Sequence, residues 1–329
     1  MPDSHQSVSY TLGNYLSITY KGLGTFVEIK NLHNGEYLWL DPWITGAYPV
    51  AKDSLQNNTI RNYLVRNNAA EKLKGILVSH AHGDHFADVP EILAQLGSAS
   101  RPADVYGDAN VQSLICQYFS ADPRYRDNYR FYADFTNADF TRRELTLWGN
   151  VQNRTDRMNY GLVHDLEKAD KSFNAPVFAD PSHPMYFFLK VTPIRWRHSQ
   201  VPEVILGADR DLSREPGLRT QYVTDVQNTT CPKLHLYGFV FDLYRINNGK
   251  PQRRACFAMI PGPRPERTQD WKLFYQKAGK RKVPFHYFLY VPSSVDFIHG
   301  NLHLDGVTSR SLTVDGSVSK IFHTADGTQ

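Results

Sequence analysis

The chain has 329 residues, enough for one large domain or two small ones. Hydrophobic residues make up 41% and charged residues 21%, which is ordinary for a globular protein with a sizeable core. The 37 basic and 33 acidic residues leave a formal net charge of +4. This mild excess would help an anionic substrate approach, but it is not the concentrated basic stripe of a dedicated nucleic-acid binder, so a long nucleic acid is not favoured as a partner.

The cysteines and the N-terminal residues are typical of a protein of a reducing compartment. Cys116, Cys231 and Cys256 are far apart and odd in number, so they form neither a metal knuckle nor a disulfide framework, and a reducing environment is expected. Residues 1–6 lack a basic region followed by an apolar stretch, and the apolar runs are too short to cross a bilayer. We therefore expect a soluble cytoplasmic protein without a transmembrane segment.

The first forty residues have the pattern of β structure, with strands predicted over residues 15–20, 25–30 and 37–40. The pair Asn34-Gly35 is typical of a hairpin turn. The third strand stops at Asp41, which is followed by a proline.

The next segment changes from helix to strand and back to helix. Residues 55–74 are polar and compatible with a helix, whereas residues 75–79 are apolar and β-branched, which favours a buried strand. A loop rich in histidine follows directly. After it, residues 88–96 carry apolar side chains at helical spacing and end at Gly97, a typical helix C-cap.

The remainder of the chain has a less regular pattern. A short strand is predicted at residues 105–107, and residues 117–184, rich in Tyr, Phe, Asp, Arg and Asn, predict an insertion. Further strands are expected over residues 185–194, 234–244, 254–260, 285–291 and 320–322. Strands and helices in mixed order predict a single α/β domain over residues 1–329.

The histidine-rich loop has the sequence His80-Ala81-His82-Gly83-Asp84-His85. His80 and His82 are two residues apart at the end of a strand, so their rings can point the same way. Gly83 has no Cβ and allows a tight backbone path that brings the next two residues around the same point. One hexapeptide thus offers three imidazoles and a carboxylate, a pattern that predicts a divalent metal site.

Residues 77–85, which contain this loop, resemble the signature loop of the metallo-β-lactamase superfamily. Residues 38–43 resemble the early strand of that family, whose terminal aspartate supports the metal loop. Residues 194–198 resemble the later strand whose terminal histidine completes the first metal site. The resemblance implies the four-layer αβ/βα sandwich of the metallo-β-lactamase type, with metals at one edge and a Tyr-rich insertion.

The resemblance also implies the role of each residue. His80, His82 and His198 would hold one ion, with a position left for water. Asp84 and His85 would contribute to a second ion. Asp41 would lie outside the ligand set and fix a loop group by hydrogen bonding.

The last ligand and the bridging acid are less well matched. Ser319–His323 fits the family's late strand best, so His323 is preferred to His299 and His303, into which no strand leads directly. Residues 255–262 contain no acid where the family usually carries a bridging aspartate, and Asp242 is expected in the middle of a strand. Without that carboxylate, a second ion should bind more weakly.

The function implied is that of a metallo-hydrolase that uses a metal-bound hydroxide on an amide, ester or lactone of a small molecule, with Asp84 orienting the water. One or two zinc ions are expected, and iron or manganese are alternatives because His/Asp sets accept them. Two other functions remain open. One is a phosphodiesterase. The other is a repurposed member with a non-hydrolytic biosynthetic or a non-catalytic role, which the missing bridging acid favours.

Overall fold

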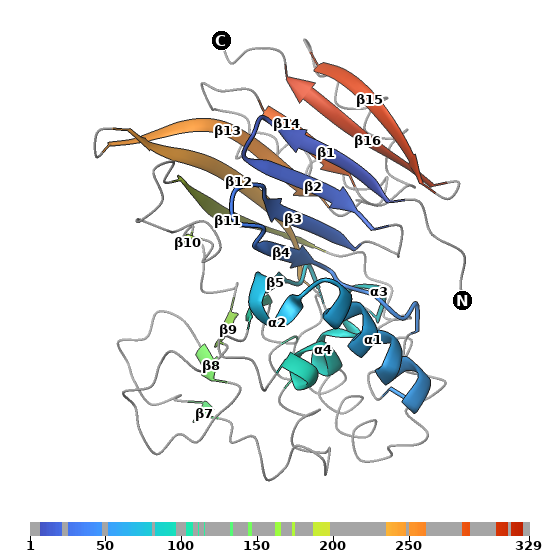
Figure 1. Ribbon diagram of the computed structural model, residues 1–329. Coiled ribbons are helices and arrows are strands. Elements are labelled where there is room, and N and C mark those ends of the chain that lie inside the picture. Colours follow the sequence, from blue (N-terminus) through green and yellow to red (C-terminus); the bar gives the residue numbers. More distant parts are fainter. Residues whose placement is uncertain are drawn as a thin grey trace.

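A computed structural model of the chain is shown in Figure 1. The structure describes residues 7–21, 26–47, 52–80, 83–96, 103–107, 111, 115, 132–133, 144–146, 162–165, 173–174, 187–197, 235–247, 250–260, 285–289, 307–314 and 317–324. Its helices in these ranges are all too short or too polar to cross a bilayer.

Nine strands form the first sheet. In spatial order they are β1 (Val8–Leu12), β2 (Leu16–Tyr20), β3 (Val27–Asn31), β4 (Tyr37–Leu40), β5 (Leu73–Leu77), β6 (Asp104–Gly107), β9 (Leu162–Asp165), β8 (Glu144–Thr146) and β7 (Tyr132–Ala133). The first four strands are antiparallel neighbours, whereas β4, β5, β6 and β9 run parallel to one another. Asn34 and Gly35 lie in the turn between β3 and β4, as predicted, and Gly35 has a positive φ of 73°.

Seven strands form the second sheet. In spatial order they are β10 (Phe173–Asn174), β11 (Phe187–Arg197), β12 (His235–Asn247), β13 (Lys250–Ile260), β14 (Phe285–Leu289), β16 (Ser317–Thr324) and β15 (Val307–Val314). The neighbours are antiparallel except β13 and β14, which run parallel.

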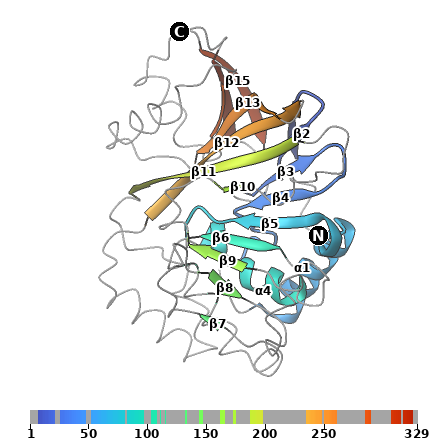
Figure 2. The same cartoon turned by 90° about the vertical axis from the view of Figure 1, so that its left-hand side faces the viewer.

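The main core lies between the two sheets (Figures 1 and 2). Alternate residues of β12 point into it, because side chains in a strand alternate between its two faces. Phe239 and Phe241 are fully buried there, and the ring of Phe241 stacks on that of Phe257 with a centroid distance of 4.5 Å. Ile29 and Leu40 contribute to the same cluster from the first sheet.

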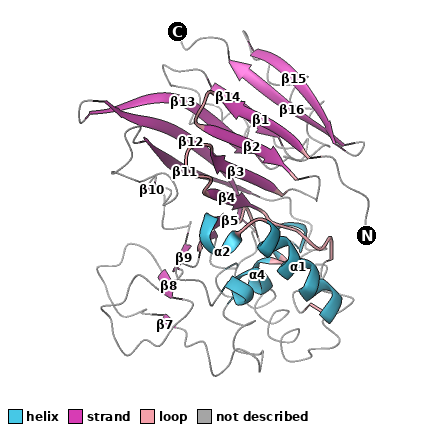
Figure 3. Ribbon diagram, in the orientation of Figure 1, coloured by secondary structure: helices cyan, strands magenta, loops and turns pink. Residues whose placement is uncertain are grey.

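Four short helices are described: α1 (Ser54–Arg66), α2 (Ala69–Lys72), α3 (Gly83–Phe86) and α4 (Val89–Leu96). Figure 3 shows α1, α2 and α4 together beside the β4–β5 part of the first sheet. In β4, Leu38 and Leu40 join the inter-sheet core, whereas Trp39 faces the helices. Its ring lies 5.8 Å from that of Tyr63 in α1, so this side of the sheet carries a helical layer.

The fold is therefore of the mixed α/β type, with two sheets and a layer of helices. The face of β12–β13 that points away from the inter-sheet core is also covered, since Val240, Cys256 and Ala258 are fully buried. The fourth layer of the predicted sandwich lies outside the described residues and stays a prediction.

Several predicted boundaries need correction. β5 begins at Leu73 rather than at residue 75, because parallel pairing with β4 and β6 sets its extent, and the preceding helical segment ends at Lys72. The insertion predicted over residues 117–184 is not confirmed. Its strands β7, β8 and β9 continue the first sheet beyond β6, and β10 pairs with β11.

Candidate metal centre

The candidate site lies where two parallel strands end. Asp41 follows β4, and its backbone N–H donates to the carbonyl of Leu77, the last residue of β5, at 2.9 Å. Val78 donates in turn to the carbonyl of Tyr106 in β6 at 2.8 Å. The carboxyl ends of parallel strands meet at one edge of a sheet, and ligands commonly bind in the crevice outside that edge.

The carboxylate of Asp41 is the centre of the hydrogen-bond network at this edge. Its Oδ1 accepts a hydrogen bond from the backbone N–H of Ser79 at 2.7 Å. Its Oδ2 lies 2.6 Å from the Ser79 hydroxyl and 2.7 Å from Nδ1 of His85. Asp41 is fully buried and has a φ of 48°, a left-handed conformation that aspartate tolerates better than most residues. Backbone strain of this kind is concentrated at functional sites.

His80 and His85 are held from the same side. Both residues are buried, and their ring centroids are 4.1 Å apart. The hydroxyl oxygen of Ser79 lies 2.9 Å from Nδ1 of His80 and 3.2 Å from Nδ1 of His85. The Nδ1 atoms of both rings therefore face the Asp41–Ser79 pair, which satisfies these buried polar groups.

Two carboxylates act on His85. Its Nε2 lies 3.4 Å from Oδ2 of Asp84, whose side chain is 37% exposed. Burial lowers the pKa of His85, but the negative charges of Asp84 and Asp41 and their hydrogen bonds outweigh it and raise that pKa to about 10. The two carboxylates thus make the surroundings of this ring negative, and a metal ion bound through it would have to displace its proton.

The second sheet also reaches the loop. The backbone N–H of Tyr237 in β12 donates to the carbonyl of Ser79 at 2.9 Å. Tyr237 pairs with Arg195 in β11, and β11 ends two residues later at Arg197. The end of β11, which directly precedes His198 in the sequence, therefore lies at the same edge as His80.

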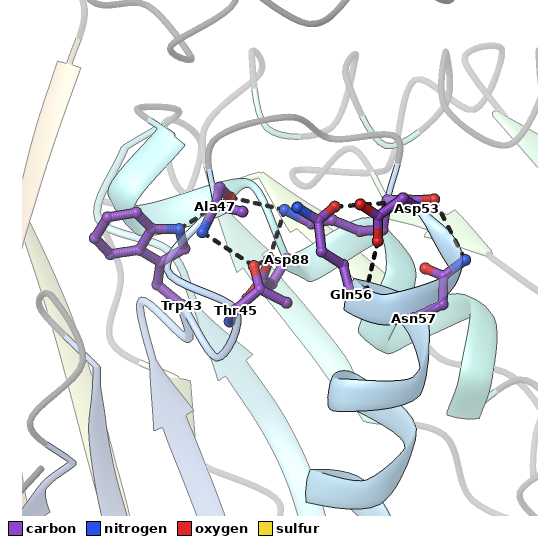
Figure 4. A network of polar contacts seen from close by, with 8 residues as sticks. Trp43, Thr45, Ala47, Asp53, Gln56, Asn57 and Asp88 are labelled. Carbon is purple, nitrogen blue, oxygen red and sulfur yellow. Dashed lines mark hydrogen bonds and ion pairs between the residues drawn. The ribbon is translucent and has the colours of Figure 1, made fainter. Parts of the chain in front are cut away.

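A buried ion pair fixes the segment after Asp41 (Figure 4). Lys52 Nζ lies 2.7 Å from Oδ1 of Asp88, and both side chains have 0% exposure. The same ammonium donates to the carbonyl of Ala47 at 2.8 Å, while Asp88 accepts from the backbone N–H and the hydroxyl of Thr45 at 2.6 and 2.7 Å. We call Lys52, Asp88 and Thr45 the Lys52–Asp88 clamp.

The clamp joins the two halves of the site. Thr45 lies four residues after Asp41, and Asp88 lies three residues after His85. The hydrogen bonds between Thr45 and Asp88 therefore restrain the position of Asp41 relative to His85, with which it is in contact. Burial lowers the pKa of Lys52, and the neighbouring carboxylate of Asp88 opposes that effect. Because burying two charges is costly, such a pair is weak evidence for stability, whereas its contacts tie Thr45 and Ala47 to Asp88 and Lys52.

Three residues of this site were missed by the sequence analysis. Ser79 carried a signal, because it stands between the end of the strand and the first histidine. Asp88 carried one too, since an aspartate before an apolar helical pattern is typical of a helix start. Lys52 had no local signal at all, because its partner is 36 residues away.

Strand pairing gives the backbone position of His323 relative to β12. His323 pairs with His286 of β14, which pairs with Phe257 of β13, which pairs with Phe241 of β12. His323 is thus three strands away from β12 and is aligned across the sheet with Phe241, four residues after Tyr237. With about 4.8 Å per strand and about 3.3 Å per residue, the backbone separation from Tyr237 is on the order of 20 Å. His323 stays a prediction that this register does not favour.

Asp242 lies in the middle of β12, as expected. It is buried, and its Oδ1 lies 3.2 Å from Nε of Arg253, so its charge is balanced within the sheet. Within the part of the chain that the structure describes, no three His, Cys, Asp or Glu side chains are arranged to hold a metal. The remaining predicted candidates lie outside that part: His82, His198, His299 and His303.

Comparisons with known proteins address the family. Among solved structures, the chain is similar to a long-form RNase Z from yeast, with 10% sequence identity and a TM-score of 0.40. The likeness covers 83% of this chain and 33% of that one, so the chain spans about a third of the length of that protein. A comparison with curated proteins finds no match. Residues 38–156, from β4 through the histidine loop, match the family model of the beta-lactamase superfamily domain. This match agrees with the resemblance that the loop sequence indicates.

Proposed function

We propose that the protein is a metal-dependent hydrolase whose ions are held at the histidine loop. The observation that carries this proposal is the buried network of Asp41, Ser79, His80 and His85 at the carboxyl ends of two parallel strands. The network lies inside residues 38–156, which match the family model of the beta-lactamase superfamily domain, and that superfamily includes metal-dependent hydrolases.

The donor set fits a divalent ion. His80, His82 and His198 would hold the first ion, and Asp84 and His85 would hold a second. Neutral imidazoles with a carboxylate suit zinc best, and the same set accepts iron or manganese. The hydrogen bonds of Asp41 and Ser79 to the buried rings are the outer contacts that metal-binding histidines usually have.

The proposed reaction is the attack of an activated water, in which Asp84 and Asp41 have different roles. A bound zinc ion would bring the pKa of a coordinated water to about 7 and polarise the oxygen under attack. Asp84 is the only one of the described acids at the loop that is partly exposed, so its carboxylate can orient an incoming water and accept its proton. Asp41 is fully buried and committed to Ser79 and His85, so it positions rather than reacts.

The proposed substrate is an amide, ester or lactone of a small molecule, and one ion is expected to bind more tightly than the other. The acid that could have bridged two ions, Asp242 in β12, is paired with Arg253 of the neighbouring strand β13. Loss of one negative ligand lowers the affinity of the second position.

Metal analysis with matched variants tests the proposal. We expect one to two zinc ions per chain in the native protein, a large loss in His82→Ala, and native content in His33→Ala, which removes a histidine in the turn before β4. Full metal content in His82→Ala would refute the proposed site. Hydrolysis of a chromogenic ester, lactone and amide is then compared with hydrolysis of bis(p-nitrophenyl) phosphate. Turnover of the phosphate diester alone would favour the phosphodiesterase, and bound metal without any turnover would favour a repurposed member.

A further inference from the structure

We infer that the hydroxyl of Ser79 fixes His80 in the tautomer with its proton on Nδ1, so that the lone pair of the ring lies on Nε2. The tautomer is a property of the protein without metal. Its use, to present Nε2 to a cation, rests on the proposed function. Ser79 is thus a positioning residue, one that the family resemblance did not assign.

The hydrogen bonds around Asp41 determine where the protons of its neighbours lie. Oδ1 is occupied by the backbone N–H of Ser79 at 2.7 Å, which pins the carboxylate in one orientation. Oδ2 faces the Ser79 hydroxyl at 2.6 Å and Nδ1 of His85 at 2.7 Å. A carboxylate supplies no proton, so at these distances both neighbours must donate to it.

The Ser79 hydroxyl has only one proton, and Asp41 takes it. Its oxygen can then act only as an acceptor toward the ring nitrogen 2.9 Å away, which is Nδ1 of His80. That nitrogen must therefore carry a hydrogen. The reverse assignment, with the hydroxyl donating to His80, would leave two oxygens 2.6 Å apart with no hydrogen between them, in a fully buried place. Such a contact is strongly repulsive at low dielectric.

The tautomer decides which nitrogen can bind a metal. A neutral imidazole binds through the nitrogen that has no proton, and the hydrogen bond of the other nitrogen sets which one that is. With Nδ1–H donating to Ser79, only Nε2 of His80 has a lone pair. Outer contacts of this kind typically change metal affinity about 10- to 100-fold when they are removed.

Two readouts separate the inference from the proposed function. The first is long-range ¹H–¹⁵N NMR of metal-free protein with ¹⁵N-labelled histidine, in which the His80 signals are identified by their loss in His80→Asn. We expect a protonated Nδ1 and an unprotonated Nε2 for His80 in the native protein and in Ser79→Thr, which keeps the hydroxyl. In Ser79→Ala this preference should disappear. A native His80 with its proton on Nε2 would overturn the inference, and this measurement requires no variant of Ser79 to fold.

The second readout is zinc affinity, measured by competition with a chromogenic chelator. Ser79→Ala should bind zinc about 10- to 100-fold more weakly than the native protein. Ser79→Thr and the control Ser17→Ala, which removes a serine hydroxyl that faces Thr19 in β2, should remain within about twofold. Equal affinity in Ser79→Ala would overturn the positioning role. If no variant or native protein binds zinc while the Nδ1–H tautomer is observed, the proposed function fails and the tautomer assignment stands.

Discussion

The Lys52–Asp88 clamp allows a quantitative prediction. Replacing Lys52 with methionine keeps much of the side-chain volume but removes the cation that lies 2.7 Å from Asp88, at a place where both side chains have 0% exposure. The change also removes the hydrogen bond to the Ala47 carbonyl. Loss of one partner of a buried ion pair typically costs about 3–5 kcal/mol, because the other charge stays buried. The two hydrogen bonds from Thr45 still stabilise the Asp88 carboxylate, so we expect the free energy of unfolding to fall by about 3 kcal/mol, the lower end of this range.

Urea unfolding of the full chain, followed by circular dichroism, measures this loss. Lys74→Met is the matched control. Lys74 lies 3.6 Å from Glu36, with side chains 15% and 26% exposed, and also donates to the carbonyl of Glu71, so its loss should cost about 1 kcal/mol. Adding Asp88→Asn to Lys52→Met removes the unpaired charge and should restore part of the lost stability.

A loss of stability in Lys52→Met no larger than that in Lys74→Met would refute the predicted cost of an unpaired buried Asp88. The same prediction would also be refuted if the added Asp88→Asn caused a further loss as large as the first, since the remaining charge would then not be the cause of the instability.

Three further outcomes are expected. Asp41→Asn should weaken zinc binding about 10- to 100-fold in chelator competition, because an amide cannot accept all three hydrogen bonds, and native affinity would contradict this. Burial raises the pKa of Tyr63 above its ordinary value of 10.0, so above pH 10 the unfolded state loses this proton first and the free energy of unfolding falls. In Tyr63→Phe that fall should be shallower by up to about 1.4 kcal/mol per pH unit in urea titrations, and parallel curves would exclude the effect. Gly107→Ala should cost about 1–3 kcal/mol, since its Cβ would lie 2.5 Å from Cγ1 of Val111. In Gly75→Ala the one short contact of the new Cβ would be with Cδ2 of Leu38 at 2.8 Å, the end of a flexible side chain, so this change should cost less; the reverse order would be inconsistent with the packing around Val111.

Local features of the chain were predictable from its sequence. The hairpin at Asn34-Gly35 follows from the backbone freedom of its residues, and the strand at Tyr37–Leu40 follows from its apolar run before Asp-Pro. The histidine loop follows β5, as predicted, but its last three residues, Gly83–His85, belong to α3 and were not predicted to be helical. Family resemblance added the expectation of a contact between Asp41 and the loop, and in the structure Asp41 accepts hydrogen bonds from Ser79 and His85.

Long-range pairing was not predictable in the same way. A strand that ends near a histidine was predicted around residues 320–322. The local sequence does not indicate, however, that β16 lies three strands away from β12. For the same reason the ion pair of Lys52 with Asp88 was missed, since a buried charge finds its partner only after the chain has folded. The strands within residues 117–184 are two to four residues long, too short to give a periodic signal.

A crystal structure of the zinc-loaded protein, with anomalous diffraction collected at the zinc absorption edge, tests the metal site directly. We predict an anomalous peak about 2.0–2.1 Å from ring nitrogens of His80, His82 and His198, with Nε2 as the coordinating atom of His80. An anomalous map without a peak at the loop, or a peak with the ring of His198 beyond bonding distance of it, would contradict the proposed metal centre.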